Sequence, residues 1–228
     1  KKFEGVLAKQ MRAARIGGLR KSILLNVLNN LVSVSDFDES LRKHMDLLKL
    51  LLRKKPSRNL SGITSITVIT APFPDGQKFS CSHNCYYCPN EPAHKDNGWQ
   101  AQPRSYLFKE PAVLRANRWD FGAIGQMLDR MDTYFSNGHV IDKLEIIVEG
   151  GTYTEYPVDY LERYHRDIFY AANIYFELRK FYPNGIDNIY NVKDINKDIR
   201  LPLSIAEEIR INKTSSVHII GICIETRP

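Results

Sequence analysis

The sequence predicts an α/β protein, with a parallel sheet that is either doubly wound or part of a barrel, preceded by a basic helical segment. Continuous β-branched and apolar runs at residues 63–69, 144–148 and 217–224 are typical of strands buried on both faces. Stretches with helical spacing of apolar residues separate them. Residues 1–60 carry 14 Lys and Arg against 5 Asp and Glu, a net charge of +9, whereas the 228-residue chain as a whole carries +6. We therefore expect two parts, a basic helical segment over 1–60 and an α/β domain over 61–228.

Two amphipathic helices are predicted within residues 1–60. Apolar residues recur at helical spacing from Leu19 to Leu31 and again from Leu41 to Leu52. Asp36 and Glu39 form a capping-box pattern, which is a helix start signal, and the second helix ends before Pro56. The polar side of this helix is mostly basic. A solvated helix face is the plain interpretation, but the excess of one sign favours a polyanionic partner.

Three further helices are expected between the strands. The first covers residues 124–131 and ends at Asn137-Gly138, a left-handed cap. The second covers residues 158–172 and is followed by a polar, irregular stretch over 177–203. Ser204 and Glu207 form another capping box, which starts a short helix that runs to about Asn212.

Composition excludes a membrane protein. No apolar run approaches the roughly 20 residues that span a bilayer, and residues 1–10 lack the apolar block of a secretory signal. Three of the four cysteines fall within eight positions, which is unlike a disulfide framework and indicates a reducing compartment, the cytoplasm or the nucleus. The chain does not begin with Met and stops directly after a strand-like run, so we expect a chain trimmed at both ends.

The cysteine triplet is the strongest functional signal. Cys81, Cys85 and Cys88 have the spacing CxxxCxxC in a loop after the first strand. Three thiolates on one loop can bind three irons of a 4Fe-4S cluster and leave the fourth iron open. The alternatives are a zinc site with His83 or His94 as fourth ligand, or reduced structural thiols. Cys223 alternates within an apolar strand and is expected in the core.

A glycine pair follows the second strand. Gly150, Gly151 and Thr152 lie at the carboxyl edge of the predicted sheet, where α/β folds collect their ligands. Glycines allow a close backbone approach at such a position. A Gly-Gly pair alone more often marks a turn than a site.

The order of strand, cysteines, strand and glycines resembles the radical S-adenosylmethionine enzymes, whose domain is a partial TIM-type parallel β/α barrel. This resemblance implies a 4Fe-4S cluster on Cys81, Cys85 and Cys88, with S-adenosylmethionine bound at the open iron. It also implies S-adenosylmethionine contacts from Gly150, Gly151 and Thr152 and from Tyr87, the aromatic residue before the third cysteine. For Tyr87, the plain alternative is loop packing. Residues 61–228 would then be the first three β/α units of an incomplete barrel.

More specific stretches resemble the catalytic subunit of Elongator. The matching stretches are residues 53–63, the Cys-Pro after the triplet, Ser105-Tyr106, Glu110-Pro111, Arg115-Ala116, Gly138-His139, VEGGT at 148–152 and ETRP at 225–228. The resemblance implies carboxymethylation of a tRNA wobble uridine at C5, with acetyl-CoA as co-substrate. It implies tRNA and other Elongator-type subunits as partners, an acetyltransferase domain beyond Pro228 and a fragment that is inactive alone.

The same resemblance assigns further residues. Glu225 and Arg227 become catalytic candidates at the end of the third strand, with an ordinary strand-end ion pair as the alternative. Arg53, Lys54, Lys55 and Arg58 resemble a tRNA-facing basic stretch. Two other functions fit the sequence: a zinc-stabilised RNA-binding module without enzymatic activity, and a radical enzyme that acts on a small molecule.

Overall fold

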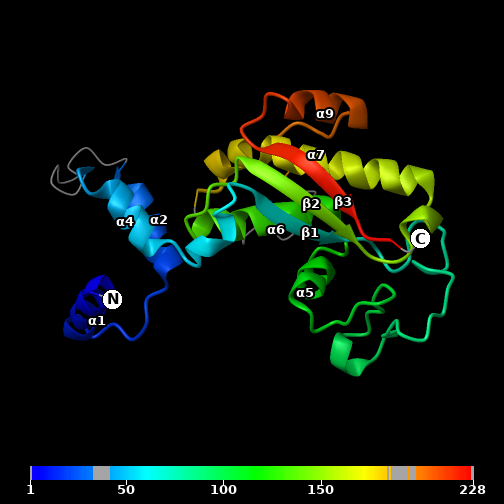
Figure 1. The fold of residues 1–228 in the computed structure, drawn as a ribbon, viewed down its shortest axis with the longest axis horizontal. Helices are drawn as coiled ribbons and strands as arrows, with labels where there is room; N and C mark the ends of the chain where they lie inside the picture. The colour runs from blue at the N-terminus through cyan, green and yellow to red at the C-terminus, as the bar shows by residue number, and fades with distance from the viewer. Residues whose placement is uncertain (1, 33–41, 184, 186–194, 196–198, 227–228) are drawn as a thin grey trace. The chain divides into compact units, whose positions relative to one another are not determined.

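The computed structural model describes residues 2–32, 42–183, 185, 195 and 199–226, and it divides the chain into two compact units (Figure 1). One unit comprises residues 1–62 and 133–140, and the other comprises residues 63–132 and 141–228. Each is described separately below. The predicted capping box at Asp36 and Glu39 lies outside the described residues.

The first unit is helical. Its helices are α1 (Lys2–Ala13), α2 (Lys21–Val32) and α4 (Met45–Leu52), followed by the 3₁₀ turn η1 (Pro56–Asn59). The two predicted helices are thus confirmed as α2 and α4, whereas α1 was not predicted. Leu25 of α2 and Leu52 of α4 are buried, while α1 buries none of its residues. At Gly138, where φ is +82°, an added Cβ would come within 3.1 Å of the Leu25 side chain, so the predicted left-handed cap is confirmed.

The second unit is built on a three-stranded parallel sheet in the order β1-β2-β3. The strands are β1 (Thr64–Ile69), β2 (Lys143–Glu149) and β3 (His218–Ile224), as predicted to within one or two residues. The remaining elements are η2 (Lys95–Asn97), α5 (Pro111–Arg118), α6 (Ala123–Ser136), η3 (Tyr153–Glu155), α7 (Val158–Phe181) and α9 (Ile205–Asn212). The mixed α/β class with a parallel sheet is confirmed. A closed or partial barrel is not tested by three strands.

Register separates an apolar face of the sheet from a more polar one. Ile66 pairs with Ile146 and Val68 with Val148, and all four side chains are buried. Helices α6 and α7 run along one side of the sheet in Figure 1, and they supply the apolar side chains that such a face requires. The sheet therefore has a conventional helix-covered core.

Helix α5 was missed, because no helix was expected between the cysteine loop and residue 124. Pro111 stands at its first turn, where the missing amide costs nothing. Val113 and Ala116 pack with Ile69 and Phe121 in a small buried cluster. The Gln126 side chain also accepts from the Ile69 amide and donates to its carbonyl, both at 2.9 Å. These contacts fix the end of β1, from which the cysteine loop departs.

Helix α7 is longer than predicted. It continues to Phe181, so the stretch expected to be irregular from residue 177 begins as helix. The Ser204–Glu207 capping box is confirmed, with reciprocal side-chain and backbone hydrogen bonds at the start of α9.

The prediction for Cys223 is wrong. Its side chain is exposed, because β3 is one of the two edge strands of the sheet and Cys223 pairs with Ile147 on the face opposite to that of Ile146 and Val148. An apolar alternation does not reveal which strand of a sheet lies at its edge.

Candidate functional site

The three clustered cysteines line one cavity of about 350 Å³ at the carboxyl ends of the strands. Cys81 is buried and Cys85 and Cys88 are half-buried, and none forms a disulfide. The other lining residues come from distant segments: His83, Tyr87, Arg104, Ser105, Tyr106, Gly150, Gly151, Thr152, Glu225 and Thr226. The structure therefore brings together the cysteines, Tyr87, the glycine turn and Glu225. Arg227 lies outside the described residues.

The glycine turn holds the cysteine loop by close backbone packing. A Cβ on Gly151 would lie 1.9 Å from the Ser80 carbonyl oxygen, and one on Gly150 would lie 1.8 Å from the Thr70 hydroxyl. Neither distance is tolerable, so only glycine fits. The close approach expected at this turn is thus made by the chain's own backbone. Contact with S-adenosylmethionine stays a prediction.

Thr152 connects the turn directly to the first cysteine. Its amide donates to the Ser80 carbonyl at 3.0 Å, and its hydroxyl oxygen lies 3.1 Å from the Cys81 sulfur. Thr152 is buried, so this contact is shielded from water. When Cys81 is a thiolate, the hydroxyl is the donor. Such a hydrogen bond orients the sulfur and adjusts the affinity and reduction potential of a metal centre that the sulfur binds.

Glu155 holds the other side of the loop. Its carboxylate accepts from the Ser82 amide at 2.7 Å and from the Ser82 hydroxyl at 2.8 Å. The His83 ring nitrogen lies 3.0 Å from the same carboxylate. Sequence reasoning missed Glu155, because the 73 positions between it and Ser82 leave no local pattern. His83 was weighed as a zinc ligand, and the structure instead gives it a carboxylate partner.

The buried side chain of Tyr156 packs against the glycine turn and hydrogen-bonds to it. The Tyr156 hydroxyl lies 2.6 Å from the Thr70 hydroxyl and accepts from the Gly151 amide at 2.6 Å. Burial raises the pKa of Tyr156 and keeps it protonated at neutral pH. The Gly151 amide is therefore already satisfied by the protein.

Acidic groups converge beside the cavity. Glu149 ends β2 and pairs with Ile69 at the end of β1. Glu225 follows β3, and its amide donates to the Val148 carbonyl at 3.0 Å, so Glu225 lies next to Glu149. Desolvation, followed by the charges of Glu225 and Glu110, raises the pKa of Glu149 to about 7. Burial is also the main cause that raises the pKa of Tyr106, with the charges of Glu149 and Glu225 adding to it. Glu149 was not predicted, although its place directly before Gly150 was a usable signal.

The cysteine geometry can be tested against the two metal centres considered. Within the described ranges, no three His, Cys, Asp or Glu side chains converge closely enough to hold a single metal ion. Tetrahedral zinc requires such convergence at about 2.3 Å from each sulfur. A 4Fe-4S cluster binds each thiolate to a different iron, so three separated sulfurs around one cavity suffice. Cys81, Cys85 and Cys88 line one cavity, which is compatible with this second arrangement.

The predicted basic stretch belongs to the helical unit. Arg53 ends α4 and Lys55 adopts a left-handed conformation with φ of 52°, so the chain turns sharply into η1. Lys54, Lys55 and Arg58 are exposed. Their position on a turn presents three cations to solvent.

Among the helices of the described ranges, none combines the length and apolarity of a membrane span.

Comparison with known proteins supports the resemblance found in the sequence. No family model matches the chain. A tRNA uridine(34) acetyltransferase of Dehalococcoides mccartyi is 31% identical over 77% of this chain and 30% of its own length. Elongator complex protein 3 of Dictyostelium discoideum is 30% identical over 78% of this chain and 27% of its own length. Elongator complex protein 3 of Drosophila melanogaster is 29% identical over 92% of this chain and 35% of its own length.

A solved structure of an Elp3 from Methanocaldococcus infernus, with an N-terminal deletion, covers 73% of this chain and 23% of its own. The identity is 18% and the TM-score 0.42, too low to carry an argument about the fold. The chain spans only about a third or less of the curated relatives named above. Within that span, the chain is a homologue of the proteins named tRNA uridine(34) acetyltransferase and Elongator complex protein 3.

Proposed function

We propose that this chain is part of a tRNA wobble-uridine modifying enzyme that uses a 4Fe-4S cluster and S-adenosylmethionine. The names of its homologues support the class of substrate. The observation that carries the cofactor proposal is the shared cavity of Cys81, Cys85 and Cys88 beside the glycine turn. The modification proposed is a carboxymethyl group at uridine C5, with acetyl-CoA as the source of the two carbons.

Each residue of the site has a distinct task. Cys81, Cys85 and Cys88 would hold three irons, and the bound cluster supplies the electron that splits a carbon–sulfur bond of S-adenosylmethionine. Thr152 would donate to the Cys81 thiolate in the metal-bound protein, and Glu155 fixes the loop beside it. Tyr87, Gly150 and Gly151 line the space in which S-adenosylmethionine would sit. Glu225 lines the same space, and with Arg227 it is proposed to act on the reacting groups.

The helical unit is proposed to bind tRNA. Lys54, Lys55 and Arg58 are exposed cations on a tight turn, and the surrounding 60 residues carry an excess of positive charge. Phosphate contacts of this kind dominate affinity for nucleic acids. The proposed acetyltransferase part, other Elongator-type subunits, and a cytoplasmic or nuclear location follow from the resemblance alone.

Metal analysis after anaerobic reconstitution tests this proposal. The proposed enzyme contains close to four irons and four sulfides and absorbs visible light. Replacing all three clustered cysteines with Ala removes both the iron and the colour. The alternative, a zinc-stabilised RNA-binding module, predicts colourless protein with zinc and no sulfide, and that result would exclude the enzyme.

A further inference from the structure

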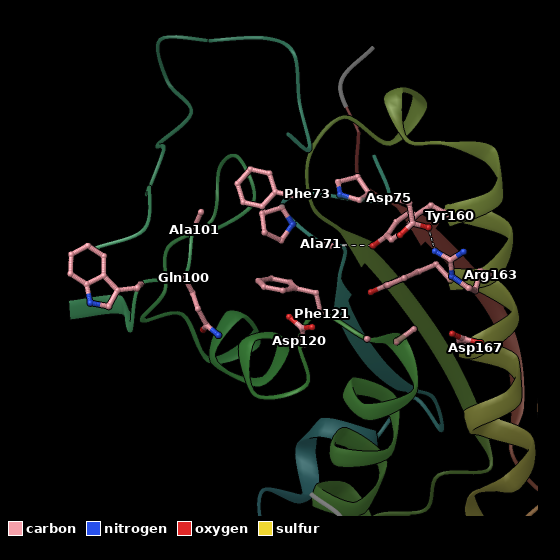
Figure 2. Close-up of a pocket in the computed structure, with 16 residues that line it drawn as sticks. Ala71, Phe73, Asp75, Gln100, Ala101, Asp120, Phe121, Tyr160, Arg163 and Asp167 are labelled. Carbon is pink, nitrogen blue, oxygen red and sulfur yellow. Dashed lines mark hydrogen bonds and ion pairs between the residues drawn. The ribbon is translucent and has the colours of Figure 1, made fainter. Parts of the chain in front are cut away.

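A second cavity, of about 480 Å³, lies in the α/β unit and shares no lining residue with the cysteine cavity (Figure 2). Its walls come from four segments of the chain: residues 71–75 after β1, residues 99–101, residues 120–123 between α5 and α6, and four side chains of α7. Its volume falls within the usual range of small-molecule sites, about 300–1,000 Å³. Nothing in the proposed reaction uses this cavity.

Aromatic rings dominate the cavity. Phe121, Tyr160 and Tyr164 are buried, and Tyr160 is held because its hydroxyl accepts from the Ala71 amide at 2.9 Å. Tyr160 also stacks on Tyr164, with ring centroids 5.6 Å apart. Phe73 and Trp99 are instead 55% and 72% exposed. Fixed rings on the inside and exposed rings at the rim suit a flat aromatic ligand.

Figure 2 shows the rings of Phe73, Phe121 and Tyr160 around the same hollow, each carried by a different segment. The backbone at Trp99, Asp120 and Phe121 has φ of 61°, 48° and 56°, a left-handed conformation that non-glycine residues seldom adopt. Three such residues at one cavity indicate that its rim is held in place by the surrounding fold.

The polar groups of the cavity are mainly acidic. Asp75 forms an ion pair with Arg163, the one cation among the lining residues. Asp167 is bound by its neighbour Arg166 at 2.7 Å, and Asp120 is exposed at the rim. This balance repels phosphate. It suits a neutral ring whose edge carries amino donors, because carboxylates accept from the amino group of cytosine.

We propose that this cavity binds a nucleobase that carries an exocyclic amino group (cytosine, adenine or guanine), stacked against Phe73 and hydrogen-bonded to Asp120, with its phosphates outside. Base–aromatic stacking is the usual way in which proteins hold unpaired bases. The base comes either from a free nucleoside or from a single-stranded loop of RNA. The RNA source alone rests on the proposed function.

The test is a titration of the intact protein with cytidine, guanosine and uridine, and with an anticodon stem-loop RNA, followed by tryptophan fluorescence and calorimetry. Trp99 at the rim reports occupancy. Cytidine and guanosine are expected to bind more tightly than uridine, which lacks an amino group. Phe73→Ala is expected to weaken cytidine about 5- to 150-fold. Phe181→Ala is the matched control, since Phe181 is 52% exposed at the end of α7 outside the cavity, and it should change nothing.

Asp120→Asn provides an independent arm, because Asn tolerates the left-handed backbone that Asp120 adopts. This substitution should weaken the binding of cytidine and leave the affinity for uridine unchanged. Binding by the RNA but not by free nucleosides, abolished by Phe73→Ala, would support the RNA source. The proposal is overturned if Phe73→Ala and Phe181→Ala behave alike, or if an arginine-rich peptide binds the cavity while nucleosides and RNA do not.

The outcome is separable from that of the proposed function. Protein whose clustered cysteines are replaced, and which therefore holds no iron, should still bind cytidine with unchanged affinity. Loss of cytidine binding in that protein, with the fold intact by circular dichroism, would contradict an independent base site.

Discussion

The Thr152 hydroxyl oxygen lies 3.1 Å from the Cys81 sulfur, although 71 positions separate the two residues in the chain. The contact joins the end of β2 to the start of the cysteine loop. Beside it, the Ser80 carbonyl occupies the space that a side chain at Gly151 would need. The turn after β2 thus packs directly against the start of the cysteine loop and holds it in position.

Thr152→Val should leave the loop in place but remove the hydrogen bond to Cys81. Donors to a cluster sulfur favour the more negative, reduced state, so we expect a lower reduction potential and weaker iron retention. Redox titration and iron analysis of the reconstituted protein measure both. The exposed Thr154→Val is the matched control. Equal effects of the two substitutions would show that the Thr152 hydroxyl does not act on the sulfur.

Gly151→Ala should destabilise the protein by about 1–3 kcal/mol, because the new methyl group must displace the Ser80 backbone. Gly221→Ala on β3 offers a contrast, since nothing lies within 4 Å of its added Cβ. Urea unfolding of the two variants tests the difference. Similar stabilities would mean that the turn at Gly151 does not pack closely against the Ser80 backbone.

Glu155→Ala should loosen the cysteine loop while leaving the cysteines themselves intact. Two hydrogen bonds to Ser82 and the contact with His83 are lost. We expect buried Cys81 to be alkylated about 10- to 150-fold faster in the metal-free protein, on the basis of about 1.5–3 kcal/mol for a hydrogen bond to a charged group. Mass spectrometry of timed iodoacetamide reactions gives the rate. Glu162→Ala, at an exposed position of α7, should react like the parent protein.

Glu149 should make stability depend on pH. Its pKa is raised to about 7 from 4.5, so the folded state binds the proton more tightly than the unfolded state does. The resulting stabilisation is complete below pH 4.5 and is lost as pH rises to about 7. Glu149→Gln should therefore flatten the pH profile of unfolding between pH 5 and 8 and raise stability at pH 8. An unchanged profile, like that expected for exposed Glu145→Gln, would contradict this assignment.

Changing Lys54, Lys55 and Arg58 together to Ala should weaken tRNA binding. The slope of log affinity against log salt should flatten by about 2 to 3, since each phosphate contact contributes roughly 0.7 to 0.9. Sequence preference should change little, because phosphate contacts do not read bases. Filter binding at several salt concentrations measures the slope. Unchanged affinity and slope would leave this turn as an ordinary solvated surface.

Local patterns in the sequence were sufficient for much of the fold. The three strands have long β-branched runs, and Ser204 with Glu207 forms a cap within four residues. Helix α5 was missed because it is only eight residues long. Two helical turns are too short to show a clear apolar periodicity beside a polar loop. Cys223 was misjudged because alternation does not reveal a sheet edge.

The candidate site was predictable only in part. The cysteine spacing and the glycine pair are local, and the parallel sheet brings their segments to the same edge. Glu155 and Tyr156 act on residues 73 and 86 positions away, respectively, so their roles depend on the folded structure. The second cavity combines four segments that share no motif.

The most direct test of the central claim is the formation of 5′-deoxyadenosine from S-adenosylmethionine by the reconstituted, full-length protein and its single cysteine variants. We predict that Cys81→Ala, Cys85→Ala and Cys88→Ala each abolish this product and lower the iron content. Cys223→Ala, at an exposed position of β3, should retain both. Loss of iron and product from Cys223→Ala, with both retained in Cys81→Ala, would contradict the assignment of the cluster to this loop.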